Sequence, residues 1–236
     1  MANSFRQLAF ESILDASFRE RQRILDRYCA ENRQRYIGMA ELIRPDLSDW
    51  RSVWTRAAFA ILSANTSFKA AVAALGYATK RIGHADPEAL SAYGMTPAKA
   101  EWLNALPREL GTRQRLLRGN NESWHDYRTR LQATVKGFAL AKASFCAALL
   151  YPTNADVACI DTHMQKVYLG HGSFKRLSVV SYLAVESKVR KVAQRHDVCT
   201  FLAQWMIWDA TRGKVENHDI FPGSHKTESE GPSWLA

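Results

Sequence analysis

Apolar residues recur along much of the chain at the three- and four-residue spacing of amphipathic helices. One such run is Trp54, Ala57, Ala58, Ile61 and Leu62, and shorter runs cover residues 5–13, 72–75 and 131–135. Strict alternation of apolar and polar residues over the length of a strand is hard to find. The pattern therefore predicts an all-α fold of about ten helices.

Helix-start and loop signals divide this helical pattern. Asp86-Pro87, Thr96-Pro97 and Ser178 have the residue types that open helices. Polar and glycine- or proline-containing stretches predict loops at 119–121 and 151–154. The last residues, 222–236, are polar and contain glycine and proline, so we expect a poorly ordered tail there.

Composition excludes several classes of protein. The 236 residues are 47% hydrophobic and include 12 Gly and 7 Pro, which excludes collagen-like and wholly disordered chains. The longest apolar run, residues 138–151, is interrupted by Lys142 and is shorter than the ~20 residues of a membrane span. The beginning, MANSFRQLAFES, lacks the pattern of a secretory signal, so we expect a cytoplasmic protein without a membrane partner.

The cysteines and the charge narrow the choice further. Cys29, Cys146, Cys159 and Cys199 are widely spread, which predicts free thiols and excludes a cluster held by closely grouped cysteines. The net charge is +9, and its excess lies in the middle and later parts of the chain. Residues 166–195 hold seven basic residues and one acidic residue, whereas residues 1–50 are neutral. This distribution indicates a polyanionic partner.

The residues that carry chemistry lie between 135 and 170. The pattern predicts a turn containing Gly137, an apolar helix from about Ala141 that carries Lys142, a loop, and an apolar approach to Asp161. An Asp at that position can cap the next helix, because it accepts hydrogen bonds from backbone N–H groups. Taken singly, Lys142 would be a solvated lysine and Asp161 a helix cap.

Together these residues resemble the helix-hairpin-helix DNA glycosylase superfamily, which includes endonuclease III and 8-oxoguanine glycosylase. Gly137, Lys142 and the segment Ile160–Met164 occupy the positions of the family hairpin, its lysine and its catalytic Asp segment. Two earlier segments agree with this order, Phe59–Thr66 and Lys99–Leu103. The family hairpin usually has two glycines, and this chain has one.

The resemblance implies a member of this superfamily, and the wide spread of the four cysteines makes it a divergent one without an iron–sulfur cluster. We expect no metal and no other cofactor. The resemblance also implies an all-α domain of two lobes over residues 1–221, with the base site between the lobes, the hairpin at about 131–150 and a tail at 222–236. Its partner would be double-stranded DNA with one base extruded, bound by a monomer. Asp161 would stabilise positive charge on the sugar, and Lys142 would form a Schiff base in a bifunctional enzyme or face a phosphate in a monofunctional one.

The same resemblance indicates which residues would contact the DNA. Asn65 would fill the gap left by the extruded base, or is simply a polar residue at a helix end. His163 is better explained as a structural residue than as a general base. The full set of expected DNA- or base-contacting residues is Asn65, Gly137, Phe138, His163, Lys136, Lys166, Trp205, Trp208, Asp209 and Arg212.

The last four of these residues lie in an unusual segment, 204–218, that does not match the common glycosylases. Trp205 and Trp208 share a helix face, which is usual for core packing but also fits a pocket that holds a flipped base. Asp209 and Arg212 are spaced to form a surface ion pair.

Three functions are compatible with these residues. The first is a DNA glycosylase that cleaves the bond between base and sugar, with or without lyase activity. The second is a phage-type transferase that joins an amine or amino acid to an activated 5-substituted thymine in DNA. The third is a DNA-binding module without activity, which the presence of both Lys142 and Asp161 disfavours. The sequence does not identify the base.

Overall fold

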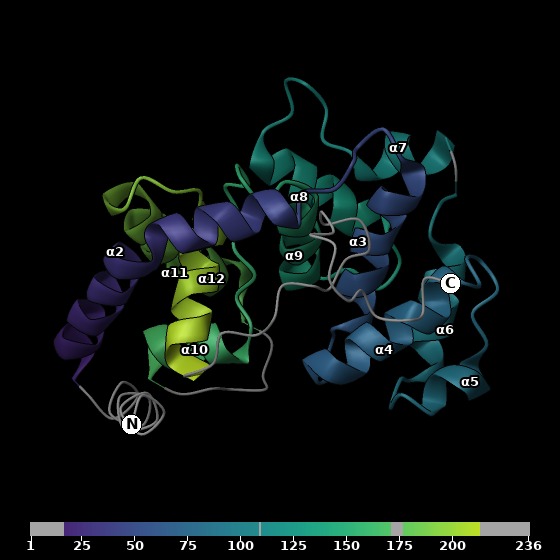
Figure 1. Cartoon of the computed structure of the whole chain (residues 1–236), viewed down its shortest axis with the longest axis horizontal. Helices are drawn as coiled ribbons and strands as arrows, with labels where there is room; N and C mark the ends of the chain where they lie inside the picture. Colours follow the sequence, from purple (N-terminus) through teal and green to yellow (C-terminus); the bar gives the residue numbers. More distant parts are fainter. Residues whose placement is uncertain (1–16, 109, 171–176, 213–236) are drawn as a thin grey trace, which may run out of the picture. The chain divides into compact units, whose positions relative to one another are not determined.

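The computed structural model describes residues 17–108, 110–170 and 177–212, and in these ranges the chain forms helices and loops but no strand. The predicted all-α fold class is confirmed. The helices are α2 (Phe18–Leu42), α3 (Trp50–Leu62), α4 (Phe68–Thr79), α5 (Pro87–Ser91), α6 (Pro97–Ala105), α7 (Leu110–Leu116), α8 (Trp124–Thr134), α9 (Leu140–Leu150), α10 (Thr162–Leu169), α11 (Val179–Arg195) and α12 (Thr200–Arg212) (Figure 1).

The described residues form two compact units. The first unit contains α2 up to Glu41 and the segment from Pro152 through α12, and the second contains residues 42–151. The predicted arrangement of residues 1–221 as one domain of two lobes stays a prediction. The predicted helix at 5–13 and the predicted tail at 222–236 lie outside the described residues.

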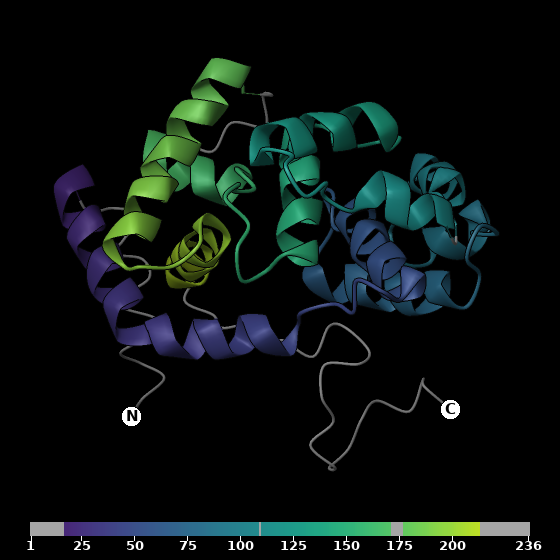
Figure 2. The ribbon, with the colours of Figure 1, turned by 90° about the horizontal axis from the view of Figure 1, so that it is seen from above.

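In the first unit, α12 lies between α2 and α11 and also packs against α10 (Figure 2). A buried hydrogen bond joins α2 to α12, because the Tyr36 hydroxyl donates to Oδ2 of Asp209 over 2.5 Å. The edge of the Tyr36 ring also contacts Trp205. These contacts fix the face of α12 that carries Trp208.

In the second unit, α3 is the central helix. Every residue from Val53 to Leu62 is buried, because α4, α6, α7 and α9 pack around this helix (Figure 1). The ring of Phe59 contacts Phe68 of α4 and Phe145 of α9. The sequence predicts only the apolar face of this helix, whereas the structure also buries Thr55 and Arg56, whose guanidinium donates to the carbonyl of Ile43 over 2.9 Å.

The predicted helix starts and loops are confirmed. Asp86 caps α5 through Glu88, Ser178 caps α11 through Ser181, and Thr96 occupies the cap position of α6. Residues 119–121 and 151–154 are loops or turns. Among the described residues, no helix is both long enough and apolar enough to span a bilayer.

Candidate active site

An extended segment in the first unit leads to Asp161. Val157, Ala158, Cys159 and Ile160 are buried, and their backbone is held by side chains instead of a neighbouring strand. Nitrogen atoms of Ala158 and Cys159 donate to Oε1 of Glu186 and Oε1 of Gln204, each over 2.9 Å. Buried backbone groups require such partners, so α11 and α12 determine the path of this segment.

Tyr182 of α11 adds a second anchor at the same place. Its hydroxyl donates to the carbonyl of Ala158 over 2.6 Å and accepts from the nitrogen of Ile160 over 3.1 Å. The hydroxyl of one buried side chain therefore hydrogen-bonds to backbone groups on both sides of Cys159. The residue that follows, Asp161, is delivered to a defined position.

The Asp161 carboxylate is held by two donors. Oδ1 accepts from the backbone nitrogen of Met164 over 2.9 Å, which makes Asp161 the N-cap of α10 as predicted. Oδ2 accepts from Nε1 of Trp208 over 3.0 Å. The side chain is partly exposed and lies at the positive end of the α10 dipole. The result is a fixed, accessible carboxylate.

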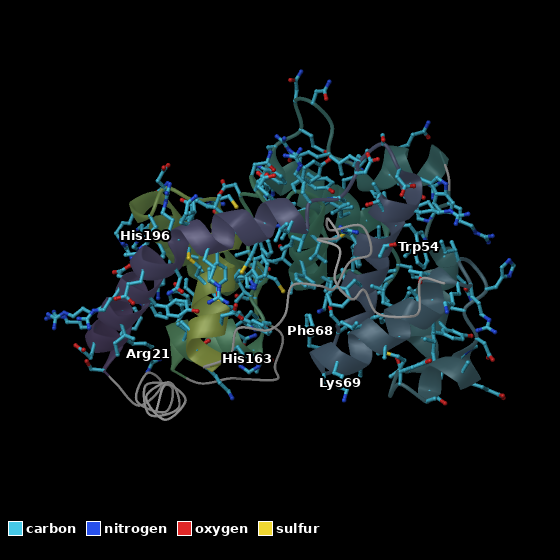
Figure 3. The ribbon with its side chains drawn as sticks, viewed as in Figure 1. Arg21, Trp54, Phe68, Lys69, His163 and His196 are labelled. Atoms are coloured by element: carbon cyan, nitrogen blue, oxygen red, sulfur yellow. The ribbon has the colours of Figure 1, made fainter. Side chains whose placement is uncertain are left out.

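The opposite end of α10 is fixed by α2. Arg21 is buried and donates from Nη1 to the carbonyls of Lys166 and Val167 over 3.0 and 2.9 Å, so it satisfies the last turn of α10 (Figure 3). Lys166 itself is exposed. His163 is exposed on the first turn of α10, and its ring meets the Trp208 ring edge-on at 6.2 Å (Figure 3).

The structure separates the two tryptophans of α12. Trp208 is half-buried and donates to Asp161, whereas Trp205 stacks on Phe201 with ring centroids 5.4 Å apart. The sequence pattern alone is compatible with core packing or with a base pocket for both tryptophans. The role of Trp208 as a hydrogen-bond donor to Asp161 was not anticipated.

The surface position predicted for Asp209 is wrong, whereas its pairing with Arg212 stays a prediction. Asp209 is 1% exposed and receives the Tyr36 hydroxyl, so its carboxylate lies inside the first unit. Burial and the negative charge of Asp209 raise the pKa of Tyr36 far above its usual value. The side chain of Arg212, which closes α12, lies outside the described residues.

The predicted hairpin is present in the second unit. Helices α8 and α9 pack against each other and are joined by residues 135–139, where Gly137 has a φ of +86°. A Cβ at this residue would lie 2.4 Å from Cδ2 of Trp102 on α6. Glycine is required here both by the left-handed backbone and by the close approach of the indole.

The residues on either side of Gly137 differ in exposure. Phe138 is 7% exposed, so its side chain packs inside the second unit and its contact with DNA stays a prediction. Lys136 is exposed and pairs with Glu101 of α6. An exposed pair of this kind contributes about 1 kcal/mol or less, so Lys136 can exchange this partner for a phosphate at little cost.

Lys142 lies on the first turn of α9 in the second unit. Its Nζ donates to Oγ of Ser63 over 3.1 Å and lies 5.4 Å from the centroid of the Phe145 ring. The side chain is neither fully buried nor fully exposed. Ser63 belongs to the turn between α3 and α4 that also carries Asn65.

Asn65 is exposed in that turn and has a φ of +50°. Asparagine is one of the few residues other than glycine that adopts this conformation at modest cost. The turn ends at Ser67, whose hydroxyl caps α4 through the nitrogen of Ala70. Lys142 of α9 therefore contacts, through Ser63, the same short turn that carries Asn65.

Three solved structures resemble this chain along most of its length. The 8-oxoguanine DNA glycosylase of Thermotoga maritima is 23% identical, with a TM-score of 0.66 over 85% of this chain and 100% of that one. The 8-oxoguanine DNA glycosylase of Methanocaldococcus jannaschii is 17% identical, with a TM-score of 0.69 over 86% and 100%. The chain has the fold of the 8-oxoguanine DNA glycosylases.

A third structure is the 8-oxoguanine glycosylase/lyase of Methanocaldococcus jannaschii in complex with 15mer DNA containing 8-oxoguanine. It is 18% identical, with a TM-score of 0.65 over 82% of this chain and 99% of that one. No family model matches the sequence, and no curated protein matches it. The glycosylase fold therefore rests on the three-dimensional comparison.

Several residues that build this version of the glycosylase fold were not identified from the sequence. Glu186, Tyr182 and Gln204 hydrogen-bond to the backbone of the extended segment that leads to Asp161. The indole of Trp102 packs against Gly137. The segment Lys99–Leu103 was recognised only as a helix start. No motif signals a side chain that binds the backbone of a residue 20 or more positions away.

The described residues include no cluster of three or more His, Cys, Asp or Glu side chains that could hold a metal ion. Cys29, Cys146 and Cys159 are buried thiols outside any disulfide, and Cys199 is a partly buried one. Burial raises the pKa of the Cys146 thiol well above its usual value. The thiols of the described glycosylase fold thus act as small apolar side chains.

Proposed function

We propose that this protein is a DNA glycosylase that removes a damaged base from duplex DNA, with 8-oxoguanine as the first substrate to test. The observation that carries the proposal is the Asp161 carboxylate, held by Met164 and Trp208 at a helix N-terminus within the glycosylase fold. The names of the similar structures support the choice of base, and the third structure supports DNA as the partner.

Asp161 would act on the sugar. When the bond between C1′ and the base breaks, its electron pair leaves with the base and positive charge develops on the sugar. A carboxylate already fixed by hydrogen bonds stabilises that charge without reorganising. The scissile bond is reached only after the nucleotide has left the helix stack.

Lys142 would supply the nucleophile. The Nζ amine attacks C1′ as the bond from C1′ to the base breaks, and the base leaves with that electron pair and takes up the proton that nitrogen loses. The nitrogen lone pair then expels the ring oxygen, which takes up a proton from water, and a protonated Schiff base between Nζ and C1′ remains. The hydroxyl of Ser63, which accepts from Nζ over 3.1 Å, would orient the amine before the attack. This step makes the enzyme a glycosylase with lyase activity.

Basic residues would hold the DNA around the extruded nucleotide. Lys136 and Lys166 are both exposed, and the chain carries a net charge of +9. Contacts with phosphates release counterions, so we expect binding to weaken steeply as the salt concentration rises.

Product analysis tests the proposal. The protein is incubated with duplexes containing 8-oxoguanine, uracil, hypoxanthine or an alkylated base, and the products are identified by mass spectrometry. We expect free base, an abasic strand and a covalent adduct that borohydride traps. Lys142→Ala should abolish the adduct, while Lys80→Ala, at an exposed lysine after α4, should leave it unchanged.

Two results would contradict the proposal. No release of base from any duplex would exclude excision of these substrates. A nucleoside of increased mass with an intact bond to its sugar would instead indicate group transfer to the base, the second function considered from the sequence.

A further inference from the structure

Lys99 of α6 is a buried lysine in the second unit, and it is 4% exposed. Its Nζ donates to the carbonyls of Leu62 and Ala64 over 2.9 and 2.6 Å and to Oγ1 of Thr66 over 2.5 Å. An ammonium has three N–H groups, and here three oxygen atoms receive them. The sulfur of Met95 lies 3.3 Å away as a fourth contact.

All three oxygens belong to the end of α3 and the turn that follows it. The last carbonyls of a helix carry partial negative charge and lack partners within the helix. Lys99 supplies those partners from another element and so closes the C-terminus of α3. None of the three oxygens is a carboxylate, so the positive charge of Lys99 is held by dipoles.

Holding a charge in this way is costly. Burial, with a smaller contribution from the positive charge of Lys142, lowers the pKa of Lys99 to about 8. An apolar side chain at this place would avoid that cost but would leave buried carbonyls without donors. The three bonds from Lys99 therefore define the shape of the turn, although burial of the ammonium carries a cost.

The turn to which Lys99 donates its hydrogen bonds also carries Asn65. Residues Leu62, Ala64 and Thr66 surround Asn65 in the sequence, and Asn65 itself is exposed with a left-handed backbone. Thr66 reinforces the turn, since its hydroxyl also lies 3.0 Å from the carbonyl of Ala64. The three oxygen acceptors of Lys99 thus lie within three residues of Asn65, and two of them belong to its sequence neighbours Ala64 and Thr66.

The same helix also contacts the hairpin. Trp102 of α6 packs against Gly137, and Glu101 pairs with Lys136. Within nine residues, α6 therefore holds both elements of the second unit that we expect to contact DNA. A displacement of α6 would move the turn and the hairpin together.

We propose that Lys99 is a positioning residue for base flipping. Its ammonium holds the turn at residues 63–66 in the shape that presents Asn65 to the DNA, and α6 sets the distance from this turn to the hairpin. The inference rests on the proposed function, in which Asn65 fills the space left by the extruded base.

The test separates flipping from chemistry. Flipping is measured by the fluorescence of 2-aminopurine in a duplex, which increases when the base leaves the stack. Chemistry is measured by borohydride trapping on a single strand with a preformed abasic site, which has no base to extrude. Lys99→Met should lower flipping by about tenfold or more, as expected for loss of a charge-assisted hydrogen bond. It should lower trapping by a clearly smaller factor, because Lys142 reaches this turn only through its contact with Ser63.

Two further variants keep the test decisive. Thr66→Val removes one acceptor and leaves Lys99 in place, so it should weaken flipping in the same direction but less. Asn65→Ala combined with Lys99→Met should flip no worse than the worse single variant, because Lys99 acts through Asn65. Circular dichroism confirms that each variant is folded.

The possible outcomes distinguish this inference from the proposed function. If the wild type flips and excises, and Lys99→Met does both equally well, the positioning role of Lys99 is overturned. If Lys99→Met loses flipping and trapping together, or its loss adds fully to that of Asn65→Ala, the role is general to the structure and the inference also fails. A wild type that flips without excising contradicts the proposed function alone, and one that does not flip contradicts both.

Discussion

Replacing Trp208 by phenylalanine tests how the candidate catalytic carboxylate is held. The change removes the Nε1–H group that donates to Oδ2 of Asp161 over 3.0 Å and keeps an aromatic ring on α12. The second donor, the nitrogen of Met164, remains in place at Oδ1. Asp161 should therefore stay at the start of α10 but lose its fixed orientation.

The size of the effect follows from the bond that is lost. A hydrogen bond to a charged group contributes about 1.5–3 kcal/mol. If this energy keeps the carboxylate oriented toward the sugar, its loss slows base removal by about 10- to 150-fold. Asp161→Asn should slow the reaction more, because it removes the charge itself.

A single-turnover assay measures this effect directly. Enzyme in excess is mixed with a duplex containing 8-oxoguanine, the rate of base release is followed, and binding is measured separately by fluorescence anisotropy. Trp50→Phe is the matched control, since Trp50 lies at the start of α3, at the other end of that helix from the Asn65 turn. We expect the rate of Trp208→Phe to fall while its binding and that of the control stay near wild type.

Two results would refute this reasoning. A Trp208→Phe protein that is folded and releases base at the wild-type rate would show that the indole does not orient the carboxylate during the reaction. A loss confined to binding, with the rate at saturation unchanged, would assign Trp208 to base stacking, which is the role suggested by the sequence.

Three further outcomes are expected from the second unit and from α2. Gly137→Ala should lower the free energy of unfolding in urea by about 1–3 kcal/mol more than the control Gly94→Ala, because both glycines have a positive φ but only Gly137 lies against Trp102. Equal losses in the two variants would contradict the importance of the contact with Trp102. Between pH 8 and 10.5 the folded chain has released the Lys99 proton that the unfolded chain still binds. As the pH rises through this range, the free energy of unfolding of the wild type should therefore increase by about 3 kcal/mol relative to that of Lys99→Met, and a pH-independent difference would argue against a lowered pKa. Tyr36→Phe removes the hydroxyl that donates to the buried carboxylate on α12 and should cost about 1–3 kcal/mol in thermal unfolding; an unchanged melting temperature would be inconsistent with that bond.

The features predicted well are those determined by neighbours in the sequence. Asp161 caps α10 because an Asp followed by a helical run can reach the backbone three residues later. Gly137 marks the hairpin because a left-handed backbone favours glycine, and the helices on both sides follow from their apolar spacing. These signals are local, and so is the physics behind them.

The features that were missed depend on contacts between distant residues. The spacing of Asp209 and Arg212 suits a surface pair, but Tyr36, 173 positions earlier, places the carboxylate of Asp209 inside the first unit. Lys99 looked like an ordinary lysine near a helix start, although it binds carbonyls more than 30 residues away. Periodicity identifies which face of a helix is apolar, but not which polar side chain crosses to a neighbouring element.

The most direct measurement is base release by Asp161→Asn in the single-turnover assay with an 8-oxoguanine duplex. Asparagine can still accept from the nitrogen of Met164, so α10 keeps its cap while the negative charge is lost. The amide nitrogen that replaces Oδ2 cannot accept from Trp208, so the effect should exceed that of Trp208→Phe. We expect the rate to fall by about 10³-fold or more with DNA binding retained. A folded Asp161→Asn protein that releases the base as fast as the wild type would contradict the assignment of Asp161 as the catalytic carboxylate.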